Sequence, residues 1–160
     1  MVQTSNQIKV NLARIHALMD SPLFKHDSSE ITSWRPVFSE LITLLNDVLH
    51  QADQLDKRVG FMDNVGVNGK IQDITSLVEW MHERLPNLPA DQPGQLSDNH
   101  LNRYFDRGTG YFANGYFFTA DFDDELAFFV DDQRIYLNRH IRRAITEAEK
   151  SLPNLNSSAL

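Results

Sequence analysis

One segment near the C-terminal end, residues 121–150, constrains the fold more than any other part of the chain. It begins with an acidic turn, DFDDE, and two short apolar runs then flank Asp131 and Asp132. Short β-favouring runs on either side of turn-forming residues are typical of a β-hairpin. The apolar residues that follow recur every three or four positions, which is the period of an amphipathic helix. The segment therefore predicts strands at 126–130 and 134–137, followed by a helix at 138–152.

Earlier parts of the chain have the same helical period. The clearest is a continuous apolar stripe that runs from Val37 to Leu55, and such a stripe is usually buried. Asp73 precedes another helical pattern and is a candidate N-cap, because its carboxylate can accept a hydrogen bond from a backbone N–H of the first turn. These patterns predict helices at about 5–19, 34–58 and 74–85, and a further short helix at 97–105.

The stretch GTGYFANGYFFTADF, residues 108–122, is rich in aromatic and β-favouring residues. Asn114 and Gly115 within it match a two-residue hairpin turn of type I′. We interpret its aromatic side chains, together with Phe128, Phe129 and Tyr136 further along the chain, as a hydrophobic sheet face packed on the helices. The alternative is a surface on which nucleic-acid bases stack, but basic residues between the aromatic ones are scarce.

Taken together, the patterns predict an α+β fold that is mainly α. We expect a bundle of about four helices, with a small antiparallel β-hairpin or meander inserted before the C-terminal helix. The chain has 160 residues, which fits one domain over 1–152 and a flexible tail at 153–160. This size is large enough to bury a hydrophobic core without covalent cross-links.

Composition excludes several classes of protein. The chain has no cysteine, so it has no disulfide framework, no thiolate zinc site and no cysteine nucleophile. No apolar run approaches the roughly 18 residues that a membrane-spanning helix needs. The first residues, MVQTSNQIKV, lack the basic and then apolar layout of a signal peptide. We therefore expect a soluble, cytoplasmic protein that does not contact membranes.

The net charge of the chain limits which kinds of partner it is expected to bind. The formal net charge is −7, from 15 basic and 22 acidic side chains, and this field repels nucleic acid. An RNA partner is therefore not favoured, and contact with phosphate requires a local basic patch. The start of the predicted last helix offers the only such patch. The candidate residues for binding an anion or a partner are Arg134, Arg139, His140, Arg142 and Arg143.

Cations at the start of a helix oppose the positive end of its dipole, so the patch needs an explanation. One interpretation is that acidic residues of the same chain supply the counter-charges. The other is a site for phosphate or for the acidic surface of a partner. The acidic candidates are Asp121, Asp123, Asp124, Glu125, Asp131 and Asp132.

Other combinations of polar residues are incomplete as catalytic or metal sites. The acidic run at 121–125 lacks the glycine and the distal glutamate of a calcium loop. Glu79 and His82 have the spacing of a di-iron ligand pair, but such a site needs a second copy of the pair, which is absent. We interpret this pair as part of a half-exposed helix face. We expect no metal ion, no cofactor and no complete set of catalytic residues.

Three stretches resemble bacterial members of the HEPN superfamily. They are FSELITLLNDVLHQADQLDKRVGF, IQDITSLVEW and DDELAFFVDDQRIYLNRHIRRAI, and they cover about half of the chain. The resemblance implies a helical bundle that dimerises. Many members are metal-independent ribonucleases of toxin or anti-phage systems, and their signature is Arg-x4–6-His late in a helix. In that pair, Arg can stabilise the charge on phosphorus while His moves a proton.

The chain departs from this signature at the place where it is expected. After 73–75 the third helix continues as WMHERLP, and no Arg precedes a His there at the required distance. The one Arg-x5-His in the chain joins Arg134 to His140 and bridges a strand and a helix start. The resemblance therefore implies a non-catalytic HEPN-like bacterial protein that acts through a homodimer or a protein partner, in a toxin or anti-phage context.

Two alternatives stay open. The first is a metal-independent ribonuclease that uses Arg134 and His140. The second is a domain that binds a nucleotide or another phosphate ligand through Arg139, Arg142 and Arg143.

Overall fold

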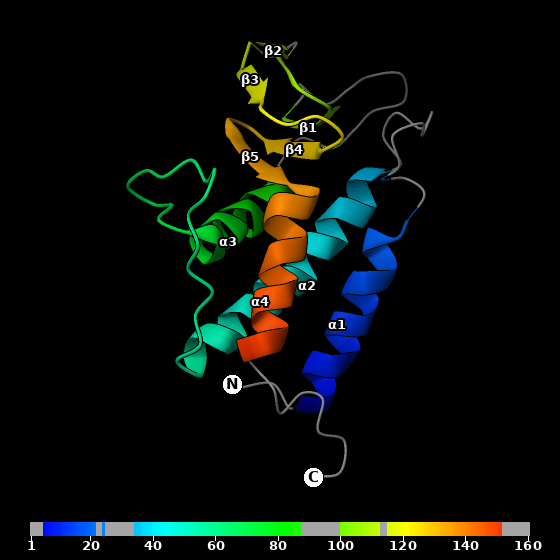
Figure 1. Cartoon of the computed structure of the whole chain (residues 1–160), viewed down its shortest axis with the longest axis vertical. Helices are drawn as coiled ribbons and strands as arrows, with labels where there is room; N and C mark the ends of the chain where they lie inside the picture. The colour runs from blue at the N-terminus through cyan, green and yellow to red at the C-terminus, as the bar shows by residue number, and fades with distance from the viewer. Residues whose placement is uncertain (1–4, 22–23, 25–33, 88–99, 113–114, 152–160) are drawn as a thin grey trace.

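In the computed structural model, four α-helices of the described residues form a bundle, and two small antiparallel sheets lie at one end of it (Figure 1). The structure describes residues 5–21, 24, 34–87, 100–112 and 115–151. The fold is α+β and mainly α, with the strands before the C-terminal helix, so the predicted fold class is confirmed. The helices are α1 (Ser5–Met19), α2 (Trp34–Gln54), α3 (Ile74–Arg84) and α4 (Arg143–Ser151).

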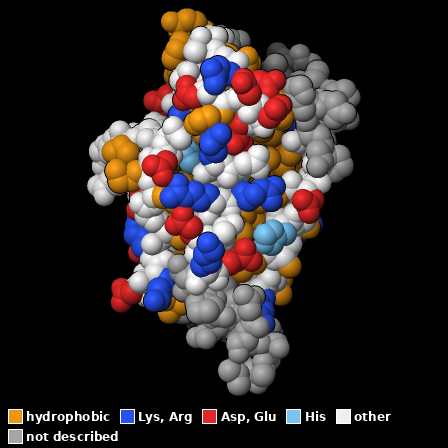
Figure 2. All heavy atoms as spheres, viewed as in Figure 1, with side chains coloured by type: hydrophobic (Ala, Val, Ile, Leu, Met, Phe, Trp, Pro, Cys, Tyr) orange, Lys and Arg blue, Asp and Glu red, His pale blue; other side chains and the backbone are white. Residues whose placement is uncertain are grey.

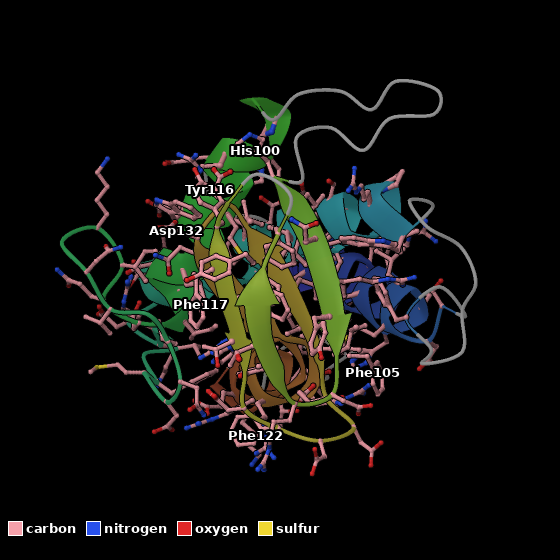
Figure 3. All side chains as sticks on the ribbon, turned by 90° about the horizontal axis from the view of Figure 1, so that it is seen from above. His100, Phe105, Tyr116, Phe117, Phe122 and Asp132 are labelled. Carbon is pink, nitrogen blue, oxygen red and sulfur yellow. The ribbon has the colours of Figure 1, made fainter. Side chains whose placement is uncertain are left out.

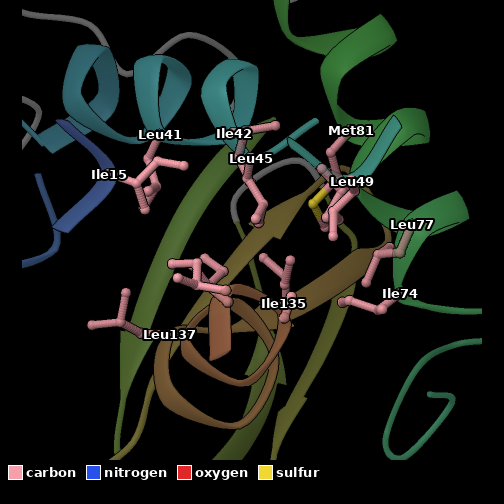
Figure 4. Close-up of a cluster of buried hydrophobic side chains, with 14 of the residues drawn as sticks. Ile15, Leu41, Ile42, Leu45, Leu49, Ile74, Leu77, Met81, Ile135 and Leu137 are labelled. Carbon is pink, nitrogen blue, oxygen red and sulfur yellow. The ribbon is translucent and has the colours of Figure 1, made fainter. Parts of the chain in front are cut away.

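The central helix α2 carries the predicted apolar stripe and buries most of it. It ends at Gln54 rather than at 58, so Leu55, the last residue of the predicted stripe, lies beyond the helix and is 46% exposed. The side chains of α2 meet those of α1, α3 and α4, and the strands close the remaining side of the core (Figure 4). Full burial of one aliphatic side chain contributes roughly 1.5–3 kcal/mol, so this cluster is the main source of stability. The fully buried residues of α2 include Phe38, Leu41, Ile42, Leu45, Val48, Leu49 and Ala52.

Asp73 caps α3, as the sequence predicts. Its carboxylate accepts a hydrogen bond from the Ser76 backbone N–H at 2.9 Å, and the Arg58 guanidinium donates to both of its oxygens at 2.9 and 3.0 Å. Burial opposes ionisation of this carboxyl, but the Arg58 and Ser76 hydrogen bonds outweigh it and hold the pKa of Asp73 below its ordinary value. The start of α3 is therefore fixed by charge-assisted contacts.

The first sheet has three strands in the order β1 (Leu101–Phe105), β4 (Leu126–Val130) and β5 (Gln133–Tyr136). Its central strand β4 is buried on both faces. Leu126, Phe128 and Val130 belong to the helical core, whereas Ala127 and Phe129 belong to a second cluster on the opposite face. A strand with alternating side chains that is buried on both faces needs a layer on each side.

The second layer is a two-stranded sheet of β2 (Gly108–Tyr111) and β3 (Phe117–Ala120), which we call the β2–β3 ribbon. It lies across the face of the three-stranded sheet that points away from the helices (Figures 1 and 3). Phe118 of the ribbon packs on Tyr104 and Phe129 of the sheet, with ring centroids 4.8 and 5.9 Å apart. The expectation that all aromatic residues of this region pack on helices is therefore wrong for the ribbon.

The prediction of a short helix at 97–105 is wrong for residues 101–105. Residues 101–105 form β1, and each of them pairs with a residue of β4, from Leu101 with Val130 to Phe105 with Leu126. Pairing with a buried neighbouring strand outweighs the weak local preference for a helix, because it satisfies the backbone and buries side chains together. Residues 97–99 lie outside the described residues.

The connection between β2 and β3 also differs from the prediction. The Phe112 N–H donates to the Tyr116 carbonyl at 2.9 Å, and the Gly115 N–H donates to the Phe112 carbonyl at 2.8 Å. Gly115 has a φ of 89°, which glycine adopts without strain. These bonds close a three-residue connection rather than a two-residue turn. Residues 113 and 114 lie outside the described residues.

The last helix begins with a π-helical turn, η3 (Leu137–Arg142), and continues as α4. Its predicted inward residues Ile141, Ala144, Ile145 and Ala148 are all buried. The predicted tail at 153–160 lies outside the described residues. Among the described helices, none combines the length and the apolar character needed to cross a membrane.

Candidate functional site

Arg134, the first of the predicted site residues, connects three parts of the molecule. Its Nη1 donates to the Thr119 carbonyl of β3 at 2.7 Å and lies 3.3 Å from the Asp121 carboxylate. Its Nη2 donates to the Asn64 carbonyl, in the loop between α2 and α3, at 3.2 Å. The guanidinium also lies over the Tyr136 ring, 4.7 Å from its centroid. Arg134 therefore holds the ribbon and the loop against β5.

His140 is fully buried, and both of its ring nitrogens have partners. The Tyr136 N–H donates to Nδ1 at 2.9 Å, and Nε2 lies 2.9 Å from the Asp63 carbonyl oxygen. Because Nδ1 accepts, the neutral ring carries its hydrogen on Nε2 and donates it to Asp63. Burial lowers the pKa of His140 to about 4, so the ring is uncharged at neutral pH. The ring therefore acts as a structural link inside the π-helical turn.

Arg139 meets an acidic residue that the sequence proposed as a counter-charge. Its Nε lies 3.7 Å from the buried Glu125 carboxylate, and its guanidinium lies 3.6 Å from the centroid of the Phe122 ring. Glu125 also accepts a hydrogen bond from the Asn138 backbone N–H at 2.9 Å, so it caps the first turn of η3. An acidic residue at this position offsets the repulsion between the cations and the helix dipole.

Arg143 pairs with Asp63, which the sequence analysis missed. Its Nη1 lies 2.6 Å from the Asp63 carboxylate and its Nε lies 2.7 Å from Glu147. Hydrogen bonds to these two carboxylates raise the pKa of Arg143 above its ordinary value. Arg142 donates to the Asn138 side chain at 3.0 Å. The structure therefore gives each of the five predicted residues an internal contact, and Figure 2 shows basic and acidic side chains interspersed over this face.

The β2–β3 ribbon exposes two aromatic side chains to solvent. Tyr111 is 74% exposed and Phe117 is 56% exposed. The two residues are paired across the ribbon, and their rings meet edge to face with centroids 5.5 Å apart. They share the outer face with Thr109 and Thr119, because side chains alternate along a strand.

Neither strand of the ribbon contains a charged residue. Their sequences are GTGY and FFTA, in a chain that carries a net charge of −7. On the inner face, a Cβ atom at Gly110 would lie 2.9 Å from the Phe118 ring. Glycine at this position therefore leaves room for the Phe118 ring of the neighbouring strand on the inner face of the ribbon.

A hollow of about 180 Å³ opens beside the ribbon, between β3, β5 and the loop that follows α2. Phe117 forms one wall of it, and Asp132 and Arg134 supply charges (Figure 3 labels Phe117 and Asp132). The hollow extends the exposed aromatic surface toward a polar rim. It is lined by Asn64, Gly66, Phe117, Thr119, Phe129, Asp132, Gln133 and Arg134.

A second polar cluster surrounds Asp131, which is only 3% exposed. Its carboxylate contacts the Arg84 guanidinium through one oxygen and His100 Nδ1 through the other. Arg84 in turn lies 4.7 Å from the centroid of the Trp80 ring. The cluster ties the end of α3 and the residue before β1 to the β4–β5 turn. Sequence reasoning missed it, because its members are 47 and 31 residues apart.

Comparison with models of known protein families, with curated proteins and with solved structures finds no match for this chain.

Proposed function

We propose that this chain is a non-catalytic protein-binding domain that docks its partner on the β2–β3 ribbon. The observation that carries the proposal is the exposed, paired rings of Tyr111 and Phe117 on a ribbon without charged residues. Aromatic side chains are enriched where proteins bind one another, because each ring buries a large area at a small cost in conformational entropy.

The position of the ribbon supports this proposal. It projects from the end of the molecule that is opposite the first turn of α1 and the last turn of α4 (Figure 1). Hydrophobic side chains are visible at this end of the surface in Figure 2. An extended, β-favouring segment of a partner matches the ribbon, because it supplies both apolar side chains and a backbone that can pair with a strand edge.

The contacts of the basic residues also favour binding over catalysis. His140 has both ring nitrogens engaged and is buried, which does not support proton exchange with a substrate. Arg134 and Arg143 each pair with a carboxylate. The ribonuclease alternative with Arg134 and His140, and the alternative of a phosphate-ligand domain, stay predictions from the sequence. Membership of the HEPN superfamily, a toxin or anti-phage role and a cytoplasmic location also stay predictions.

A display experiment tests the proposed function. The immobilised protein is panned against a random-peptide phage library, and enriched peptides are then measured against a Tyr111→Ser, Phe117→Ser double variant. We expect enrichment of extended β-favouring peptides and a loss of affinity of at least tenfold in the double variant, since two buried rings contribute roughly 3–6 kcal/mol at most.

The matched control is Val10→Ser on α1, because Val10 is 61% exposed and lies outside the ribbon. This variant should retain the peptides with unchanged affinity. If no peptide is enriched, or if the double variant binds as tightly as the wild type, the ribbon is not the docking surface.

A further inference from the structure

The backbone of β2 has one edge whose hydrogen-bonding groups face away from β3. The Phe112 N–H donates to the Tyr116 carbonyl, and the register pairs Gly110 with Phe118. Inward and outward hydrogen bonding alternates along an antiparallel strand. Gly108 and Gly110 therefore bond to β3, whereas Thr109 and Tyr111 direct their N–H and C=O groups to the outer edge of β2.

By contrast, the outer edge of β3 is already occupied. The same alternation directs the Thr119 carbonyl away from β2, and this carbonyl accepts the hydrogen bond from Arg134 at 2.7 Å. For Thr109 and Tyr111, the described part of the chain supplies no hydrogen bond to these outward backbone groups. The two edges of the ribbon therefore differ, and β2 provides the open one.

Open strand edges are usually protected by proline or by charged residues such as lysine, because an unprotected edge pairs with another chain. The strand β2 reads GTGY and has none of these residues. The outward backbone groups of Thr109 and Tyr111 thus form a short edge to which another strand can add.

We propose that the partner at this edge is a second copy of this chain, which pairs its own β2 antiparallel to the first. This inference rests on the proposed function, since it names the partner of the same ribbon. With Gly110 on the twofold axis, Thr109 of each copy lies opposite Tyr111 of the other. The two residues of each pair exchange both of their outward hydrogen bonds, and the ribbons join into one four-stranded sheet.

Charge and symmetry favour a second copy as the occupant. An antiparallel strand paired with itself across a twofold axis matches every donor to an acceptor. The side chains that meet are Thr109 and Tyr111, which are uncharged, so the two copies approach without like charges in contact. Each copy carries a net charge of −7, so repulsion acts only between more distant groups.

The expected association is weak and reversible. A stable dimer buries about 800 Å² on each partner, and a four-residue strand with its aromatic pair supplies less than this. We therefore expect a dimer whose population depends on protein concentration. Added salt should strengthen it by screening the negative charges, whereas salt would weaken docking of a basic partner.

Sedimentation velocity of the full chain over a range of concentrations tests the proposal. We expect the mass to rise from one chain to two, at lower concentrations in 500 mM salt than in 50 mM salt. Thr109→Pro removes an outward N–H without removing a hydrogen bond to β3, so this variant should remain a single chain throughout. Thr109→Lys places a charge at the edge and should also remain a single chain.

The control is Val10→Lys, which places the same charge on an exposed residue of α1 outside the ribbon. It should dimerise like the wild type, and circular dichroism verifies that all variants are folded. If Thr109→Pro does not fold, Thr109→Lys decides the outcome. A wild-type chain that stays single at every concentration, or a Thr109→Lys variant that dimerises normally, overturns the proposal.

The two proposals fail in different ways. If the wild type stays a single chain but still captures peptides through Tyr111 and Phe117, the self-pairing is wrong and the proposed function stands. If it neither dimerises nor captures peptides, both are wrong.

Discussion

At the scale of single residues, the polar groups that the sequence singles out act mainly inside the molecule. His140 is the clearest case, because a buried neutral ring connects the backbone before the last helix to the loop at Asp63. The π-helical turn widens the backbone where this ring is accommodated, and such turns are rare enough to need a local cause. His140 therefore contributes to stability in a way that depends on pH.

The unfolded chain protonates His140 near pH 6.5, whereas the folded protein protonates it only near pH 4. Between these values the unfolded state binds more protons, so the free energy of unfolding falls as the pH falls. The contribution is complete above pH 6.5 and is lost by pH 4, and it amounts to about 3 kcal/mol. Urea unfolding of the wild type from pH 7 to pH 4 should detect this loss.

His140→Gln should be less stable than the wild type at pH 7, because the ring's hydrogen bonds are lost, but its stability should vary less over the same pH range. His16→Gln, which replaces an exposed histidine of α1 in the same way, is the control for the substitution itself. Equal pH profiles for the wild type and His140→Gln would contradict the buried, neutral state of the ring.

At the scale of elements, the two strands of the ribbon fit together because Gly110 of β2 leaves room for the Phe118 ring of β3. A Cβ atom added at Gly110 would lie 2.9 and 3.1 Å from two atoms of the Phe118 ring. Gly110→Ala should therefore displace the Phe118 ring from its packed position and lower the free energy of unfolding by about 1–3 kcal/mol, as overpacking does. Urea unfolding measures this change.

Gly69→Ala is the matched substitution, because nothing lies within 4 Å of the position of its Cβ. It should change the free energy of unfolding by less than about 0.5 kcal/mol. Similar losses in the two variants would show that the Phe118 ring does not pack closely on Gly110.

The elements that the sequence predicts well are those whose signal is local. The stripe of α2 and the cap at Asp73 lie within one segment, and the two strands around Asp131 and Asp132 are bounded by their own turn. The strand β1 was missed because its partner β4 begins 21 residues after β1 ends, and pairing of that kind leaves no local pattern. The aromatic stretch predicts strands, but only the structure separates the buried Phe118 from the exposed Phe117.

At the scale of the whole molecule, contacts between distant segments determine which charges remain available. Arg143 and Asp63 are 80 residues apart, and Arg134 and Asn64 are 70 residues apart. The sequence could name the cations and two of their counter-charges, Asp121 and Glu125, but it could not place the loop after α2 beside them. The same contacts leave the charge-free ribbon as the candidate site.

Amide hydrogen exchange at Thr109 and Tyr111 tests the account most directly, because it measures whether the backbone N–H groups at the outer edge of β2 are hydrogen-bonded. In dilute solution both amides should exchange rapidly, whereas the Gly110 amide, which bonds to β3, should be protected. At concentrations where the chain dimerises, Thr109 and Tyr111 should become protected. Rapid exchange of both amides at every concentration at which the protein remains soluble would contradict the account.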